Sequence, residues 1–98
     1  MIQLQLISRG DVNLEMAIRN AISTGKIKSF ETAQVVGGLK ITHKKHPGLI
    51  RIEKSKRIEL AMVSCTNPSK EWQLLEAFVG RIAYHFHKEV AAINIQFD

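Results

Sequence analysis

The first pattern along the chain is a strict alternation of apolar and polar residues at its beginning. Positions 2, 4 and 6 are Ile or Leu, and positions 3 and 5 are Gln. This period of two is typical of a strand buried on one face. The same alternation returns at the end of the chain, at Ala91, Ile93, Ile95 and Phe97. Residues 2–7 and 91–97 are therefore predicted strands.

Two segments have the spacing of three and four that indicates a helix with one buried face. In the first, Asn13 can cap a helix whose apolar residues include Leu14 and Ile18, and Gly25 can end it. The second begins at Asn67-Pro68, since proline suits the first helical position, and is predicted to reach His87. Its broad apolar stripe consists of Trp72, Leu74, Leu75, Phe78, Val79, Ile82, Ala83 and Phe86.

The region between the helices has strand character. Residues 31–41 alternate around Gly37-Gly38, which predicts one strand with a kink or bulge at the glycines. After a turn at His46-Pro47-Gly48, residues 49–53 and 58–64 are predicted as the arms of a hairpin with its tip at 54–57. Residues 60–63 are apolar on both parities, which favours a central strand buried on both faces.

These elements predict a single α+β domain over residues 1–98, in the order β-α-β-β-β-α-β. We expect two helices on one face of a mainly antiparallel sheet, an arrangement that is ferredoxin-like in broad terms. The composition agrees, because 45% of residues are hydrophobic and 23% are charged, as in ordinary globular proteins. The strand order cannot be deduced from the pattern.

Charge changes this picture, because it is concentrated in one stretch. Residues 40–57 hold seven of the fourteen Lys and Arg residues and one acid, a net charge of +6, whereas the remainder has seven bases and eight acids. Such a local positive field attracts phosphate backbones. The predicted nucleic-acid-binding residues are Lys40, Lys44, Lys45, Arg51, Lys54, Lys56 and Arg57. Protonation of His43 and His46 at mildly acid pH would add to this field.

The sequence limits what kind of binding this could be. No aromatic residue lies between Phe30 and Trp72, so the basic stretch lacks the side chains on which bases stack. An RRM aromatic signature, a KH-type GxxG and zinc-finger spacing are absent as well. We therefore expect contacts to the phosphate backbone of a nucleic acid or another polyanion. The alternative is that the lysines only protect sheet edges and keep the protein soluble.

Candidate chemistry is sparse. His43, His46, His85, His87 and the single cysteine, Cys65, are the residues that could form a metal or nucleophilic site. The two histidines near the end of the second helix lie 200° apart on it, and Cys65 has no paired base in the sequence. We predict no catalytic residue, no metal and no cofactor, and we favour a non-enzymatic protein. A small enzyme with Cys65 or His85 in a pocket is the third interpretation.

The outer side of the second helix suggests an oligomer. Ala77, Gly80 and Tyr84 form a smooth strip where charged residues are expected, and glycine inside a helix costs about 1 kcal/mol relative to alanine. We predict a homodimer whose interface includes these three residues. The alternative function is accordingly a protein-interaction or structural subunit that acts as a homo-oligomer.

The location follows from what the sequence lacks. The N-terminus has no basic leader followed by an apolar run, and no segment approaches the roughly 20 apolar residues that a membrane span needs. One cysteine cannot form an internal disulfide. We expect a cytoplasmic protein without membrane contact. The leading hypothesis is a small basic domain that binds nucleic acid or another polyanion.

Overall fold

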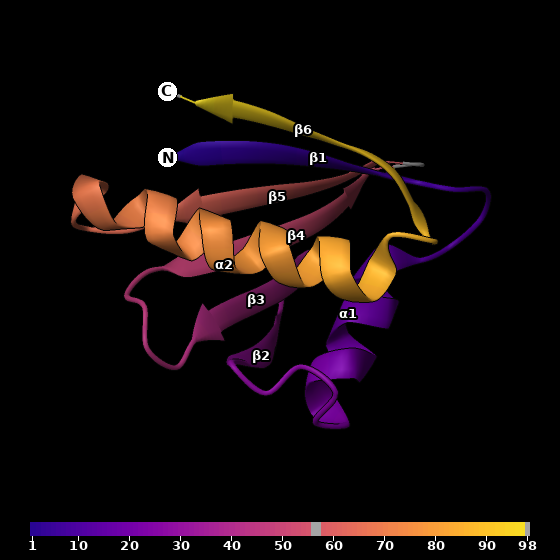
Figure 1. The fold of residues 1–98 in the computed structure, drawn as a ribbon, viewed down its shortest axis with the longest axis horizontal. Helices are drawn as coiled ribbons and strands as arrows, with labels where there is room; N and C mark the ends of the chain where they lie inside the picture. The colour runs from indigo at the N-terminus through magenta and orange to yellow at the C-terminus, as the bar shows by residue number, and fades with distance from the viewer. Residues whose placement is uncertain (56–57, 98) are drawn as a thin grey trace.

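The computed structural model describes residues 1–55 and 58–97, with the side chains of residues 54 and 55 left aside. Two helices and six strands follow one another in this part of the chain (Figure 1). In chain order they are β1 (Ile2–Ser8), α1 (Leu14–Ser23), β2 (Phe30–Val35), β3 (Gly38–His43), β4 (Leu49–Ser55), β5 (Ile58–Ser64), α2 (Pro68–Phe86) and β6 (Val90–Phe97).

The six strands form one open sheet in the order β2-β3-β4-β5-β1-β6, and each neighbouring pair is antiparallel. The predicted α+β class and the antiparallel sheet are confirmed. The first strand lies between β5 and β6, so Ile2 is paired with Phe97 and the two chain ends lie side by side (Figure 1). Both edges of this sheet, β2 and β6, are single strands with one neighbour each in the described chain.

The predicted order of five strands is wrong in one place. Residues 31–41 are not one kinked strand, because the chain reverses at Val36 and Gly37 and β2 pairs with β3 as a hairpin. Gly37 has φ +82°, a conformation that glycine adopts readily. Gly38 is buried where β3 meets β4, and a Cβ there would collide with the carbonyl oxygen of Ile52. The two glycines therefore have different roles, one in the turn and one in a close approach of strands.

The core lies between one face of the sheet and the two helices. Alternate residues of the strands point into it, among them Leu4, Leu39, Ile52 and Val63, and all are fully buried. From α2, the fully or nearly fully buried side chains are Leu74, Phe78 and Ile82. The helix α1 contributes Leu14, Ile18 and Ala21 to the same cluster. Both helices thus cover one face, and this side of the sheet is the core face.

The opposite side of the sheet carries no layer in the described chain, and we call it the open face. The strand β5 is central, as its apolar sequence predicts, but it is not buried on both sides. On the open face, Leu60 is exposed and Met62 is half-buried, whereas Ala61 and Val63 are fully buried on the core face. The apolar pattern of residues 60–63 therefore predicted the central position of β5 correctly. Its prediction of burial on both faces is wrong, because only the core face of β5 is covered.

Candidate functional site

The open face presents side chains in regular rows across the strands. In one row, the backbone register aligns Lys40 of β3, Arg51 of β4, Met62 of β5 and Gln3 of β1. These four residues point the same way because directly paired residues of antiparallel strands share a face. The row is basic at its β3–β4 end and neutral toward β1. The positive charge of the open face is therefore concentrated on one half of the sheet.

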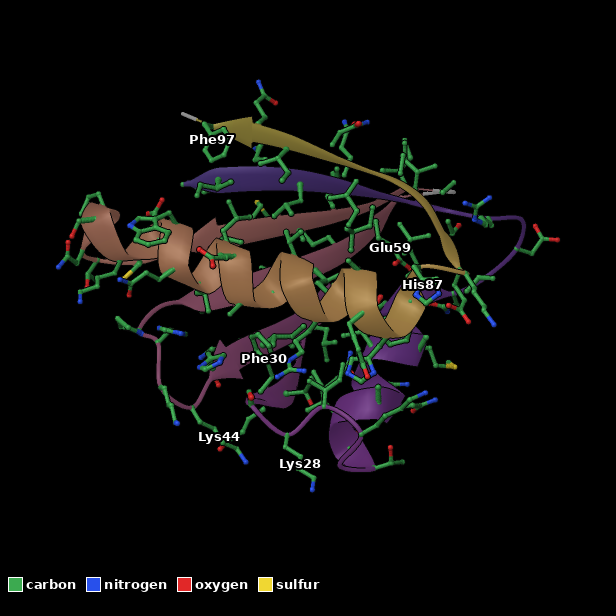
Figure 2. All side chains as sticks on the ribbon, viewed as in Figure 1. Lys28, Phe30, Lys44, Glu59, His87 and Phe97 are labelled. Carbon is green, nitrogen blue, oxygen red and sulfur yellow. The ribbon has the colours of Figure 1, made fainter. Side chains whose placement is uncertain are left out.

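The seven residues predicted to bind nucleic acid do not form one patch. Lys40 and Arg51 are paired on the open face, and Lys44 and Lys45 lie in the loop that joins β3 to β4 (Figure 2). Lys54 is near the other end of β4, a strand about 20 Å long. Lys56 and Arg57 lie outside the described residues. The structure thus places Lys44 and Lys45 together in one loop, with Lys40 and Arg51 in the middle of the adjoining strands.

The guanidinium of Arg51 is held by contacts with two other residues of the chain. Its Nη2 donates to the carbonyl oxygen of Val36 at 3.0 Å, and its Nε lies 3.1 Å from Oε1 of Glu53. The guanidinium thereby satisfies a carbonyl in the turn between β2 and β3, and Glu53 offsets its charge. Arg51 accordingly has a structural role that its position in a basic run did not suggest. In the described chain, Lys40, Lys44 and Lys45 have no such carboxylate partner.

The loop that carries Lys44 and Lys45 is organised by His43. The ring Nδ1 of His43 accepts hydrogen bonds from the backbone N–H groups of Lys45 and His46, at 2.9 and 3.1 Å. The N–H of Lys44 donates to the carbonyl oxygen of Ser29 at 2.9 Å. Both exposed lysine side chains therefore extend from a backbone with fixed hydrogen bonds, which reduces the entropy lost when they bind a ligand.

His43 does not add charge to this surface in the way that the sequence suggested. Burial lowers its pKa from the usual value of 6.5, and the nearby His46, Lys45 and Arg81 lower it further. Its ring stands edge-on to Phe30, with centroids 4.8 Å apart. A protonated Nδ1 could not accept the two loop hydrogen bonds. The neutral form of His43 is therefore part of the loop structure.

A shallow cavity of about 490 Å³ lies on the same half of the sheet, and Lys40 is one of its lining residues. The other lining residues include three that carry hydroxyls, Thr42, Ser64 and Thr66, together with Gly48, Leu49 and Cys65. Hydroxyl and ammonium groups are donors for phosphate oxygens. The residues around the cavity therefore include the kinds of donor that an anion subsite requires.

Cys65 also lines this cavity and is half-buried. Its backbone N–H donates to Oε2 of Glu71 at 3.2 Å, and Oε1 of Glu71 lies 3.2 Å from the Met1 ammonium. Glu71 thus joins the end of β5 to α2 and to the chain start. His85 is nearly five turns along α2, about 26 Å from its first residue by helix rise. Cys65 and His85 therefore do not share a pocket, and nothing in their placement supports paired catalysis.

The remaining histidines provide no common centre. His87 places its Nδ1 3.2 Å from the carbonyl oxygen of Ala83, and His85 is half-buried in the last turn of α2. Burial lowers the pKa of His85, and the charges of Lys26 and Arg81 act in the same direction. Within residues 1–55 and 58–97, no three His, Cys, Asp or Glu side chains gather as metal ligands would.

A second hollow, of about 520 Å³, runs along the outer side of α2, and we call it the helix groove. It is lined by the three residues predicted as an oligomer interface, Ala77, Gly80 and Tyr84, together with Trp72, His46 and others. Trp72 is 53% exposed, although its helical angle predicted a buried position, and Tyr84 is 72% exposed. A Cβ added at Gly80 would meet no atom within 4 Å. The packing of this chain alone therefore does not require a glycine there.

Two buried carboxylates were missed from the sequence. Glu59 in β5 is 4% exposed, and Glu71 in α2 is also buried. The signal for Glu59 was its parity, since it alternates with Ala61 and Val63 and so points to the core face. Its Oε1 accepts a hydrogen bond from the backbone N–H of Glu15 at 2.9 Å, in the first turn of α1. Glu59 is thus a structural cap and not part of the surface site.

Comparisons with family models, with curated proteins and with solved structures each found no match to this chain. Neither α1 nor α2 is long and apolar enough to cross a bilayer. The functional argument therefore depends on the surface described above.

Proposed function

We propose that this protein binds nucleic acid through the phosphate backbone. The proposed contact lies on the half of the open face that contains β3, β4 and the loop joining them. The binding surface consists of Lys40, Lys44 and Lys45 with the hydroxyls of Thr42, Ser64 and Thr66. The observation that carries the proposal is that these three lysines have no carboxylate partner in the described chain, and that one of them, Lys40, lines a cavity with Thr42, Ser64 and Thr66. Arg51 supports the turn between β2 and β3 and is not counted among these contacts.

The chemistry of this surface favours affinity without sequence recognition. Ammonium groups that neutralise phosphates release condensed counterions, and hydroxyls can orient the backbone without reading a base. The rest of the open face includes Gln3, Gln5, Leu60 and Met62, and no described strand places an aromatic side chain on this face for base stacking. Binding should therefore be strongly dependent on salt and nearly independent of sequence.

The test is binding of generic duplex DNA and of structured RNA across a salt series. For duplex DNA, we expect the double variant Lys40→Glu/Lys44→Glu to weaken binding and to reduce the slope of log K against log salt by about 2. The matched control is Arg9→Glu/Lys88→Glu, which changes the net charge equally at exposed positions away from the loop. No binding of the wild type at low salt, or equal losses in both variants, would overturn the proposal.

A second candidate function is binding of a protein partner through the helix groove. The specific observation is the pair of exposed aromatic residues, Trp72 and Tyr84, with Ala77 and Gly80 between them. Aromatic residues at a hollow are typical of protein interfaces. Gly80→Arg fills the groove without a clash inside the chain and should abolish such binding while leaving the melting temperature nearly unchanged.

We also propose that the fold is ferredoxin-like with one inserted hairpin. Without β2 and β3, the remaining elements follow the order β-α-β-β-α-β, and their strands lie in the order β6-β1-β5-β4. This is the split arrangement in which each helix connects two strands that are not adjacent. The hairpin β2–β3 extends the sheet beyond β4 and supplies Lys40 and the start of the basic loop.

A further inference from the structure

The strand β6 is an edge that lacks the usual protection. It has eight residues and pairs with β1 on one side, and within the described chain no strand pairs with its other side. Native edge strands are generally protected by charged residues, by proline, by a bulge or by short length. The sequence of β6 contains neither a charge nor a proline, and its register shift lies at its first residues, opposite Ile7 and Ser8. Most of β6 can therefore accept another strand.

Apolar side chains accompany this free edge on the core face. Ile93, Ile95 and Phe97 are paired with Leu6, Leu4 and Ile2, so they point toward the helix side of the sheet. Ile95 is nevertheless 40% exposed and Phe97 65% exposed. The reason is visible in Figure 1, where α2 lies across the middle of the sheet and leaves β6 to one side.

The first turns of α2 extend the exposed area. Trp72 and Phe97 line a hollow of about 350 Å³ together with Met1 and Pro68. Figure 2 shows Phe97 at the end of β6, at the outer edge of the sheet. We call the exposed residues Trp72, Ile95 and Phe97 the β6 strip. The free backbone edge and the β6 strip adjoin each other, so one partner could cover both.

We propose that this partner is a second copy of the chain, bound by antiparallel pairing of β6 with β6 to form one continuous sheet of twelve strands. A two-fold axis perpendicular to the sheet keeps the core faces of both copies on the same side. It therefore brings the two β6 strips together between the two α2 helices. The backbone groups of each edge pair with identical groups of the other, as a self-complementary interface requires.

The charge distribution favours a second copy. Because β6 is uncharged, no like charges oppose each other across the new strand pair. The basic stretch is on the other half of the sheet, with β5 and β1 between β4 and the edge. At about 4.8 Å per strand, the two copies of β4 would lie about 34 Å apart. Salt screens charges beyond about 8 Å under physiological conditions, so the basic residues of β4 in the two copies do not oppose the dimer.

The other edge of the sheet does not offer the same surface. The strand β2 contains Glu31, and Gln34 accepts a hydrogen bond from Nη1 of Arg19 in α1 at 2.8 Å. Gln34 also donates to the carbonyl oxygen of Gly38 at 3.0 Å. A charge and a helix thus stand beside β2, whereas β6 has neither. This difference selects β6 as the edge that continues the sheet.

The first experiment is sedimentation of the wild type over a micromolar concentration series, with Ile95→Lys and Val36→Lys beside it. Both substitutions replace an exposed apolar residue by lysine, and Val36 is 94% exposed in the β2–β3 turn. We expect a monomer–dimer equilibrium for the wild type and for Val36→Lys. Ile95→Lys should raise the dissociation constant at least about tenfold, since a lysine must enter an apolar contact.

A crosslinking scan tests the same proposal without a charge. In antiparallel self-pairing about this axis, one residue of β6 faces its own copy. Single cysteines placed along β6 in a Cys65→Ser background should therefore form an intermolecular disulfide most readily at one position and poorly at its neighbours. Circular dichroism identifies variants that unfold, and Phe97→Lys replaces Ile95→Lys if that variant does not fold.

The outcomes separate the possible partners. A dimer that Ile95→Lys weakens and that crosslinks at one position of β6 supports the proposal. A wild type that stays monomeric throughout the series would overturn it. A dimer that resists Ile95→Lys and is lost in Gly80→Arg would also overturn it and would locate the interface in the helix groove. None of these results depends on nucleic-acid binding.

Discussion

The two outer strands of the sheet differ in how they meet the solvent. In β2, Phe30 is buried at one end, Arg19 of α1 binds Gln34, and Gly38 accepts a hydrogen bond from the same glutamine. In β6, a side-chain hydrogen bond runs inward, from Asn94 to Gln5 of the neighbouring strand at 3.3 Å. The exposed Ile95 and Phe97 have no comparable restraint.

This contrast shows that an edge strand is protected from further pairing by contacts with residues outside that strand. Both strands have residues that suit a sheet, and β6 is even the more apolar of the two. What distinguishes β2 is the helix beside it and the side chains that reach it from α1. The sequence of β6, read alone, would fit a strand in the interior of a sheet.

Among the substitutions that test this difference between the two edges, Phe30→Ala should have the largest effect. It removes the buried aromatic ring of β2. The ring of Phe30 lies edge-on to His43 and to Phe78, with centroids 4.8 and 6.2 Å apart. We expect a loss of about 3–5 kcal/mol in the free energy of unfolding, measured by urea denaturation. The matched change at the other edge, Phe97→Ala, should cost less than about 1 kcal/mol at monomer concentrations. Equal losses would contradict the distinction between the edges.

A smaller effect is expected from Glu59→Ala, which loosens the helix beside β2. The Glu59 carboxylate accepts the N–H of Glu15 at the N-terminus of α1, where the helix dipole also favours a negative charge. We expect a loss of about 1–3 kcal/mol and faster hydrogen exchange in β2 than in β6. Asn13→Ala removes the local cap of the same helix and should cost about 1 kcal/mol. Unchanged exchange in β2 would show that α1 does not protect it.

The smallest effect is a pH dependence at the end of β3, where His43 supports the basic loop. Burial, His46, Lys45 and Arg81 all lower the pKa of His43 in the folded state. The unfolded state therefore binds the proton first, and stability falls as the pH decreases below about 6.5. The melting temperature should decrease from pH 7 to pH 5, with a weaker decrease in His43→Asn.

Two features qualify this pH test. Asparagine retains an oxygen that can accept the loop N–H groups but does not titrate, so it separates protonation from loss of the hydrogen bonds. A residual slope is expected in the variant, because the pKa of His85 is lowered too. A variant with the same pH profile as the wild type would exclude His43 as the titrating group.

Much of the fold could be predicted in those strands and helices where a single periodicity of apolar residues extends over the whole element. The alternation in β1 and the apolar spacing of both helices follow from one buried face each. The glycine pair at 37–38 was misread, because a kink and a two-residue reversal have the same pattern of apolar residues. Trp72 was misplaced for another reason. Its helical angle matches the buried stripe, but its surroundings depend on how far α2 extends over the sheet.

The candidate site was predictable in its charge and not in its shape. Lysines that are close in the sequence are carried apart along β4, and this separates Lys54 from Lys44. Conversely, the strand pairing brings Thr42 to the same cavity as Ser64 and Thr66, although they are distant in the sequence. The role of Arg51 also depends on a turn that the sequence did not predict. The order of strands in the sheet determines which of these residues become neighbours. It cannot be deduced from the periodicity of apolar residues within any one segment.

The position of β1 between β5 and β6 has a consequence for synthesis on the ribosome. The strand β1 is synthesised well before both of its neighbours, β5 and β6, with Ile2 paired to Val63 and to Phe97. Its apolar face therefore cannot be covered by a complete sheet until both β5 and β6 have been synthesised. Folding that depends on such distant contacts is slow for a small protein. Until β6 has been made, the apolar face of β1 is consequently a segment that a chaperone can protect.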